Sequence, residues 1–322
     1  MRLFRQLLNF IAAVALIAAA IGLVAVAFGY VLAGAWEYEK PKEDSRQETW
    51  MEVNGEPMHL TVKGPQNGPV MILLHGTDVE GSLTFTYNIE ALSKAGIRVI
   101  AIDFPGFGYS TRNPALGYMA NDQARLLGEI INAMQLKNVT LVGFQRGAAV
   151  ALEYALQHPE VVARIALISP QVYHDARPLD PGVVSLPVIG RSLMWSRIAG
   201  PLLYESRRDL FANPNHLTMD YRKLVAGTTH IVGTNDFRRS WMTDQRRDRI
   251  TGINRLSEVL SPVLILSGTD DTSPSAGEVR QLVQALQDAE WRELHDTGVY
   301  LHQEDIEQTN QRLIEFGLRG TR

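Results

Sequence analysis

The segment LVGFQRGAA (residues 141–149) joins a run of apolar residues to a tight turn and then to a helix of small residues. Gly143 and Gly147 flank the turn, because only glycine lets a strand and a helix approach this closely. Gln145 occupies the centre of the turn. A carboxamide has no ionisable proton and cannot act as a nucleophile. The segment therefore predicts a strand–turn–helix with a neutral, non-nucleophilic amide at the centre of its turn.

Buried-strand patterns alternate with helical patterns on both sides of this segment. Continuous apolar runs occur at 69–74, 97–102, 138–143, 162–168 and 262–268. A hairpin around Asn54–Gly55 precedes them. Such runs separated by helices predict an α/β fold with a mostly parallel sheet covered by helices on both faces. The alternation stops between about 171 and 260, which predicts an inserted helical cap.

The N-terminus has the pattern of a membrane anchor. From Gln6 to Trp36 there is no acidic, basic or histidine residue, and this run exceeds the roughly 20 residues that span a bilayer. A cleaved signal peptide is the alternative, with Ala33-Gly34-Ala35 as its cleavage site, but the run is longer than a usual signal. The expected organisation is an anchor at 1–36, a linker at 37–47 and one α/β domain at 48–322 that contains the insertion.

The charge pattern predicts how the anchor is oriented. Arg2 and Arg5 precede the apolar run, and mixed charges follow it. The positive-inside rule then places the N-terminus in the cytoplasm and the main domain outside, on a single-pass protein of the cell membrane.

Composition excludes several function classes. The net charge of -4 gives no basic field for nucleic acid. The chain has no cysteine, which excludes disulfides and thiolate nucleophiles. The eight histidines show no metal-ligand spacing, and GFG at 106–108 lacks the third glycine of a dinucleotide site. We therefore expect no metal and no cofactor.

Five motifs in order resemble the α/β-hydrolase fold superfamily, in particular its capped members such as epoxide hydrolases, haloalkane dehalogenases and esterases. The resemblance covers about residues 48–318. The motifs are LLHG at 73–76, IDFPGFGYS at 102–110, LVGFQRGAA at 141–149, PVLILSGTDD at 262–271 and DTGVYLHQED at 296–305.

The resemblance implies a catalytic triad whose three positions can be read in this chain. Gln145 holds the nucleophile position, Asp271 the acid position and Val299 the histidine position. Neither a carboxamide nor an isopropyl group can perform the chemistry of those positions. His302, three residues after Val299, is the candidate substitute base. The triad is therefore expected to be degenerate.

The resemblance also implies a binding pocket. The backbone N–H groups of Thr77 and Arg146 are expected to form an oxyanion hole. His75, Gly76 and Gln145 are expected to complete a ligand-binding site.

Two functions follow from these residues. The first is a membrane-anchored pseudoenzyme that catalyses no hydrolysis and binds a small apolar or acyl ligand, or a protein partner. The alternative is an active hydrolase of ester or epoxide substrates, or a lyase, with a non-standard set of catalytic residues. Candidates for that set are His75, Asp78, Ser110, His174, Asp175 and His302.

Overall fold

An eight-stranded sheet organises the chain, and the order of its strands is β1-β2-β4-β3-β5-β6-β7-β8. The computed structural model describes residues 2–38, 48–173, 186–198, 208–244 and 251–320. β1 (Glu48–Val53) and β2 (Glu56–Lys63) form the predicted hairpin at one edge. β2 then pairs antiparallel with β4 (Arg98–Ile102).

The remaining strands run parallel, as the apolar runs predicted. They are β3 (Val70–Leu74), β4, β5 (Val139–Phe144), β6 (Val162–Ile168), β7 (Val263–Gly268) and β8 (Ala289–Leu294). Phe144 pairs with Ile168, and Ile168 pairs with Leu266. The carboxyl ends of β5, β6 and β7 therefore meet at one edge of the sheet.

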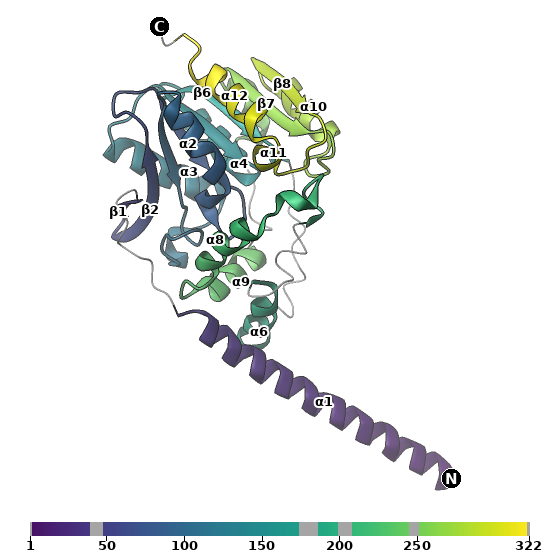
Figure 1. Ribbon diagram of the computed structural model, residues 1–322. Coiled ribbons are helices and arrows are strands. Elements are labelled where there is room, and N and C mark those ends of the chain that lie inside the picture. Colours follow the sequence, from purple (N-terminus) through teal and green to yellow (C-terminus); the bar gives the residue numbers. More distant parts are fainter. Residues whose placement is uncertain (1, 39–47, 174–185, 199–207, 245–250, 321–322) are drawn as a thin grey trace.

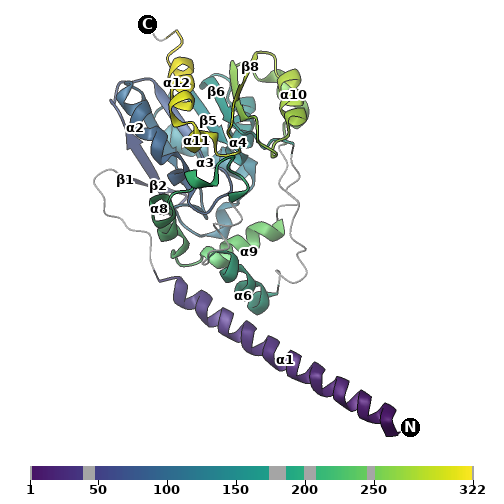
Figure 2. The same ribbon diagram turned by 45° about the vertical axis from the view of Figure 1, so that its right-hand side comes forward.

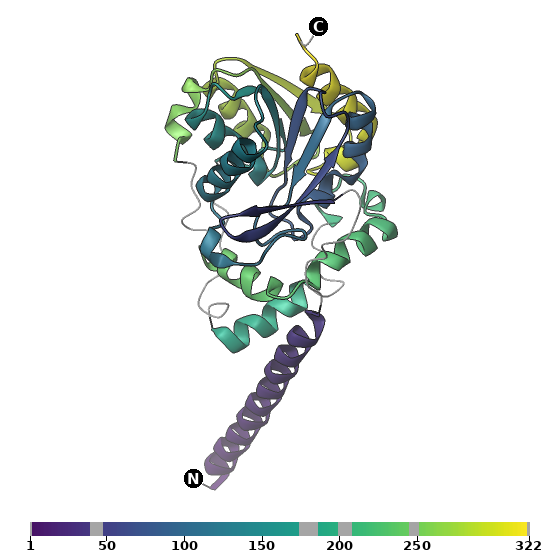
Figure 3. The ribbon, with the colours of Figure 1, turned by 90° about the vertical axis from the view of Figure 1, so that its left-hand side faces the viewer.

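Alternate residues of the strands point to opposite faces of the sheet and belong to two separate hydrophobic cores. In β3, Ile72 and Leu74 belong to the core under α3 (Ala120–Ala133), α4 (Arg146–Gln157) and α10 (Ala276–Ala285). Met71 and Leu73 belong to the core under α2 (Thr86–Lys94) and α12 (Ile306–Gly317). Figure 3 shows helices on both sides of the sheet. The predicted fold class is confirmed.

The described part of 171–260 contains helices and no strand, in keeping with the predicted helical insertion. Its longer elements are α6 (Pro187–Ile198), α8 (Met219–Thr229) and α9 (Thr234–Asp244). In Figures 1 and 2 these helices lie between the sheet and the N-terminal helix. We call α6, α8 and α9 the cap.

Helix α1 (Arg2–Trp36) projects away from the body of the molecule in all three ribbon views. Phe4–Trp36 is long and apolar enough to cross a membrane, with a mean hydropathy of 2.8 over 18 residues. Its large apolar side chains are exposed, for example 71% at Leu16 and 72% at Leu23. Length and composition alone do not distinguish an anchor from a signal sequence.

Candidate active site

The turn after β5 has the conformation that the sequence predicted. Gln145 has φ 46° and ψ −111°, a strained combination for a residue with a side chain. Its N–H donates to Ile168 O at 2.9 Å, and its carbonyl accepts from Gln171 N at 3.1 Å. A Cβ on Gly147 would lie 2.1 Å from Leu74 O, so only glycine fits there. The glycine and the hydrogen bonds hold the strained turn in place.

The Gln145 side chain lies against the loop after β3. A Cβ added to Gly76 would lie 2.4 Å from Gln145 Oε1, so the amide covers the backbone of that residue. Gln145 is 5% exposed, and Oε1 has no hydrogen-bond partner among the described residues. Buried polar atoms in proteins are nearly always hydrogen-bonded, to water where no protein group is present. Oε1 is therefore an acceptor available to water or to a bound molecule.

Asp271 lies three residues beyond the end of β7. Its Oδ1 accepts from Ser273 N at 2.8 Å, whereas Oδ2 has no hydrogen-bond partner among the described residues. Burial raises the pKa of Asp271 to about 6, although the hydrogen bond from Ser273 N opposes the increase. A carboxyl group with this pKa is ionised at neutral pH and can still hold a proton. Asp271 is thus a suitable general base.

Ser169 connects the acid position to the histidine position. This buried residue follows β6 and has φ 44°. Its hydroxyl donates to Val299 O at 2.8 Å and lies near the Asp271 carboxylate, to which it donates no hydrogen bond. Val299 itself is 1% exposed, and its N–H donates to Leu210 O at 2.8 Å. The three positions read from the sequence therefore gather around Ser169 and Gln145 at one edge of the sheet.

His75 has a fixed protonation state that follows from its neighbours. Nε2 accepts from Phe104 N at 3.1 Å, so it carries no proton, and Nδ1 must then donate to Gly76 O at 2.6 Å. Burial lowers the pKa of His75. The neutral ring therefore holds the turn at Gly76, and we assign it no proton transfer.

The cap forms a hydrogen bond with the loop that follows His75. Thr77 O accepts from Arg238 Nη1 of α9 at 2.6 Å. Arg146 is partly buried, and burial lowers its pKa to about 10, so its side chain stays positive at neutral pH. The backbone N–H groups of Thr77 and Arg146 stay our prediction for the oxyanion hole.

His302 is buried on the other side of β5. Its ring centroid lies 4.4 Å from that of Phe144, and its Nε2 lies 3.0 Å from Thr84 Oγ1. Burial lowers the pKa of His302 to about 3, which makes the ring a poor base at neutral pH. We assign this histidine to packing rather than to catalysis.

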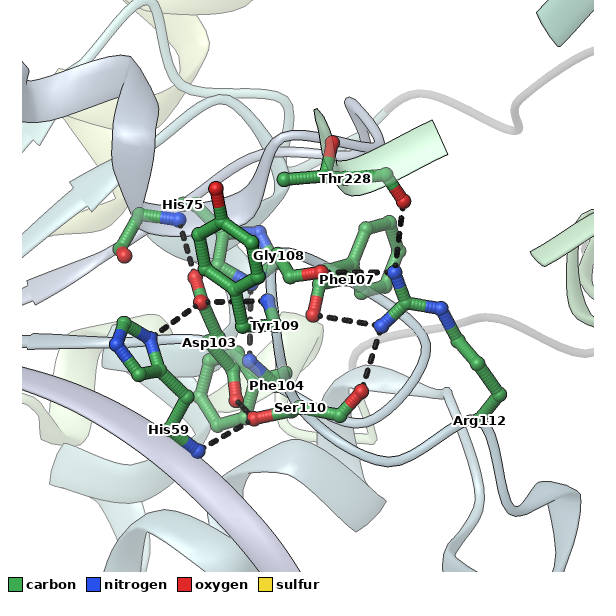
Figure 4. Close-up of polar contacts among 11 residues, drawn as sticks. His59, His75, Asp103, Phe104, Phe107, Gly108, Tyr109, Ser110, Arg112 and Thr228 are labelled. Carbon is green, nitrogen blue, oxygen red and sulfur yellow. Dashed lines mark hydrogen bonds and ion pairs between the residues drawn. The ribbon is translucent and has the colours of Figure 1, made fainter. Parts of the chain in front are cut away.

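The loop at 103–110 is organised by Asp103, as Figure 4 shows. Oδ2 accepts from Tyr109 N at 2.9 Å and lies 2.7 Å from His59 Nδ1, and Oδ1 accepts from Ser82 N at 2.6 Å. Burial opposes ionisation of Asp103, but the hydrogen bonds that it accepts, first from His59, lower its pKa overall. Ser110 donates to Asp103 O at 2.5 Å. Asp103 and Ser110 therefore fix the loop.

Some residues of the site carried no readable sequence signal. Ser169 ends an apolar strand, and Arg238 is one of several arginines in the cap. Asp78, a candidate from the sequence, accepts a hydrogen bond from the Tyr300 hydroxyl. His174 and Asp175, also candidates, lie outside the described residues.

Comparison with known proteins gives consistent matches. Residues 71–312 match the model of the Alpha/beta hydrolase family. A 2-hydroxy-6-oxononadienedioate/2-hydroxy-6-oxononatrienedioate hydrolase of Paraburkholderia phymatum is 26% identical over 254 residues, covering 76% of this chain and 86% of the relative.

Solved structures of the same fold superpose well. An esterase from Exiguobacterium antarcticum has a TM-score of 0.69 at 20% identity, covering 84% of this chain and 98% of the esterase. A structure titled as a membrane phospholipase A, a bacterial virulence factor, has a TM-score of 0.68 at 20% identity, covering 98% of this chain and 99% of that one.

These relatives correct one prediction from the sequence. The expectation of a pseudoenzyme without hydrolytic activity is wrong, because relatives that align with most of the chain are named as hydrolases. The expectation rested on the loss of nucleophile and histidine alone. The alternative, an active hydrolase with a non-standard set of residues, is better supported.

Proposed function

The chain belongs to the alpha/beta hydrolase family, and we propose that it is an active hydrolase in which water, rather than a side chain, attacks the substrate carbonyl. Gln145 cannot form a covalent intermediate, so in this proposal water attacks directly and no acyl-enzyme forms. Asp271 is the base of that step.

Two orphan acceptors support this proposal. Gln145 Oε1 and Asp271 Oδ2 are both buried without a hydrogen-bond partner among the described residues. They follow β5 and β7, the two neighbours of β6 at the carboxyl edge of the sheet. Water has two protons to donate, one for each acceptor. We propose that one water donates to both acceptors, which leaves its oxygen lone pairs for a substrate carbonyl.

The proposed step conserves atoms and charge. The water oxygen bonds to the carbonyl carbon while one of its protons passes to Asp271. The N–H groups of Thr77 and Arg146 stabilise the oxyanion that forms. The intermediate then collapses, the bond to the alkoxide breaks, and the alkoxide takes the proton back from Asp271. The products are a carboxylic acid and an alcohol.

We propose membrane lipids with acyl ester bonds as the substrate class, which specifies the small apolar or acyl ligand expected from the sequence. Helix α1 is retained as the anchor in this proposal, with the N-terminus cytoplasmic and the main domain outside. The cap lies between α1 and the sheet (Figure 1), and we propose that lipid enters from this side. The membrane phospholipase A aligns over 98% of this chain, α1 included.

Hydrolysis by the purified full-length protein tests the proposal. We expect release of fatty acid from phospholipid in mixed micelles, and slower turnover of a short-chain p-nitrophenyl ester. Asp271→Asn should lower both rates about 10²- to 10⁴-fold, whereas Asp270→Asn, a change of the exposed neighbour, should leave both near the wild-type rate. Equal rates for Asp271→Asn and the wild type would exclude Asp271 as the base.

A further inference from the structure

The end of helix α1 is packed into the cap. A Cβ added to Gly29 would lie 2.0 Å from Ser192 Oγ of α6, so the two helices are in direct contact. Trp36 Nε1 donates to Thr229 Oγ1 at 3.0 Å, and His230 Nδ1 donates to Trp36 O at 2.9 Å. The last turn of the apolar helix is therefore fixed to the end of α8 and to the residue that follows it.

Glu37 extends this contact to the beginning of α9. The sequence placed this residue in a linker, yet it is only 8% exposed. Its carboxylate accepts from Asn235 N at 2.5 Å and from Gly233 N at 3.1 Å, and Arg191 Nη2 lies 3.6 Å away. A carboxylate at a helix N-terminus satisfies free N–H groups and complements the helix dipole. Glu37 therefore caps α9 although it lies nearly 200 residues earlier in the chain.

Helix α9 in turn contacts the loop of the site. Arg238, one turn into the helix, donates to Thr77 O at 2.6 Å. The Phe237 ring lies 5.1 Å from the ring of Phe107, in the loop that Asp103 organises. The first turn of α9 is therefore in contact with Thr77 and with the loop at 103–110.

We infer that Glu37 is a positioning residue. Through α9 and Arg238 it connects the end of α1 to the loop at 77–83, which begins with the proposed oxyanion-hole residue Thr77. The anchor then does more than hold the protein at a membrane, because its end sets the order of the loop. The consequence for turnover rests on the proposed hydrolase function. The consequence for the order of the loop does not.

Amide hydrogen exchange of the full-length protein in micelles tests the inference. The readout is the loop at 77–83, where Gly81 N, Ser82 N and Leu83 N are hydrogen-bonded. Glu37→Ala should accelerate exchange there and at 233–236 by about five- to tenfold, since a lost helix cap is worth about that factor. Glu37→Gln keeps one acceptor oxygen and should give a smaller increase.

Two further variants complete the comparison. Asp220→Asn removes the same charge from a side chain on α8 that is 97% exposed, and should leave both segments at the wild-type rate. Arg238→Met should accelerate amide exchange in the loop at 77–83. Adding Glu37→Gln to this variant should accelerate exchange in that loop no further, because the two residues act in series.

The outcomes are distinct. Faster exchange at 233–236 with an unchanged loop at 77–83 would overturn the inference, leaving Glu37 as a local helix cap. Unchanged exchange in both segments would also overturn it. If the wild type hydrolyses the p-nitrophenyl ester, Glu37→Gln should lower kcat and leave KM unchanged. If it hydrolyses nothing, the proposed function fails while the exchange experiment still decides the role of Glu37.

Discussion

Asp271 is partly buried, and its pKa of about 6 lies close to neutral pH. Its protonation should therefore set the pH dependence of hydrolysis. With a pKa of about 6, the carboxylate that accepts the proton of water predominates above pH 6 and is lost below it. We predict that kcat/KM falls about tenfold for each pH unit below 6 and is flat above about pH 7. Initial rates between pH 4.5 and 8 check this. A profile that rises toward low pH would contradict the assignment.

The same carboxyl should affect folding stability with a definite sign. Its pKa is raised from 3.8 to about 6, so the folded state binds the proton more tightly than the unfolded state. The stability gained from that proton is complete below pH 4 and is lost as pH rises through 6. Asp271→Asn should therefore gain about 1–3 kcal/mol relative to the wild type between pH 4 and pH 8. Urea unfolding in micelles at both pH values measures this difference, and a constant difference would contradict it.

Single residues differ in how far the sequence reveals them. Gln145, Asp271 and Val299 could be located because flanking glycines and strand patterns fix their positions. What these residues do could not be predicted in the same way. The burial that raises the pKa of Asp271, and the two buried acceptors proposed to hold water, depend on segments far apart in the chain.

The loop between β4 and α3 depends on one buried charge. Asp103 holds His59, Ser82 and Tyr109, which come from three separate segments. Asp103→Asn keeps the shape of the side chain but replaces the charged carboxylate with a neutral amide, which weakens the hydrogen bonds that this side chain accepts. Loss of a hydrogen bond to a buried charged group costs about 1.5–3 kcal/mol. We expect a loss of that size in the free energy of urea unfolding, and a loss below about 1 kcal/mol would show that the charge is dispensable.

The contact between α1 and α6 can be tested directly, because the chain has no cysteine. An ideal Cβ at Gly29 lies 3.1 Å from Ser192 Cβ, a few tenths of an ångström closer than in most disulfides. Gly29→Cys with Ser192→Cys should therefore form one disulfide in nearly all molecules under mild oxidation. Mass spectrometry of the full-length protein measures it. Gly22→Cys with Ser192→Cys is the control, since nothing lies within 4 Å of a Cβ at Gly22, and equal yields from both pairs would contradict the packing.

Helices and strands could be predicted where the apolar residues follow a clear pattern along the sequence. The hairpin and the parallel strands followed from apolar runs and turn residues, whose local pattern matches the structure that they form. The attachment of Glu37 to α9 was not predictable. A charged residue after an apolar helix has the composition of a linker, and only the fold brings the beginning of α9 beside it.

The arrangement of the whole molecule places three parts in series: an apolar helix, a cap and a sheet whose carboxyl edge carries the candidate site (Figure 2). This order motivates the proposal that the substrate is a membrane lipid, because the cap lies between the apolar helix and the sheet. Fold alone does not establish activity, so the account depends on the chemistry at Gln145 and Asp271.

The first turnover of an acyl ester by the purified full-length protein is the most direct measurement. Rapid-quench detection of the alcohol, combined with the intact mass of the protein, distinguishes attack by water from attack by a side chain. We predict linear release without a burst, no acylated protein, and a rate about 10²- to 10⁴-fold lower for Asp271→Asn. A burst of one equivalent with an acyl adduct, or no turnover above that of Asp271→Asn, would contradict the account.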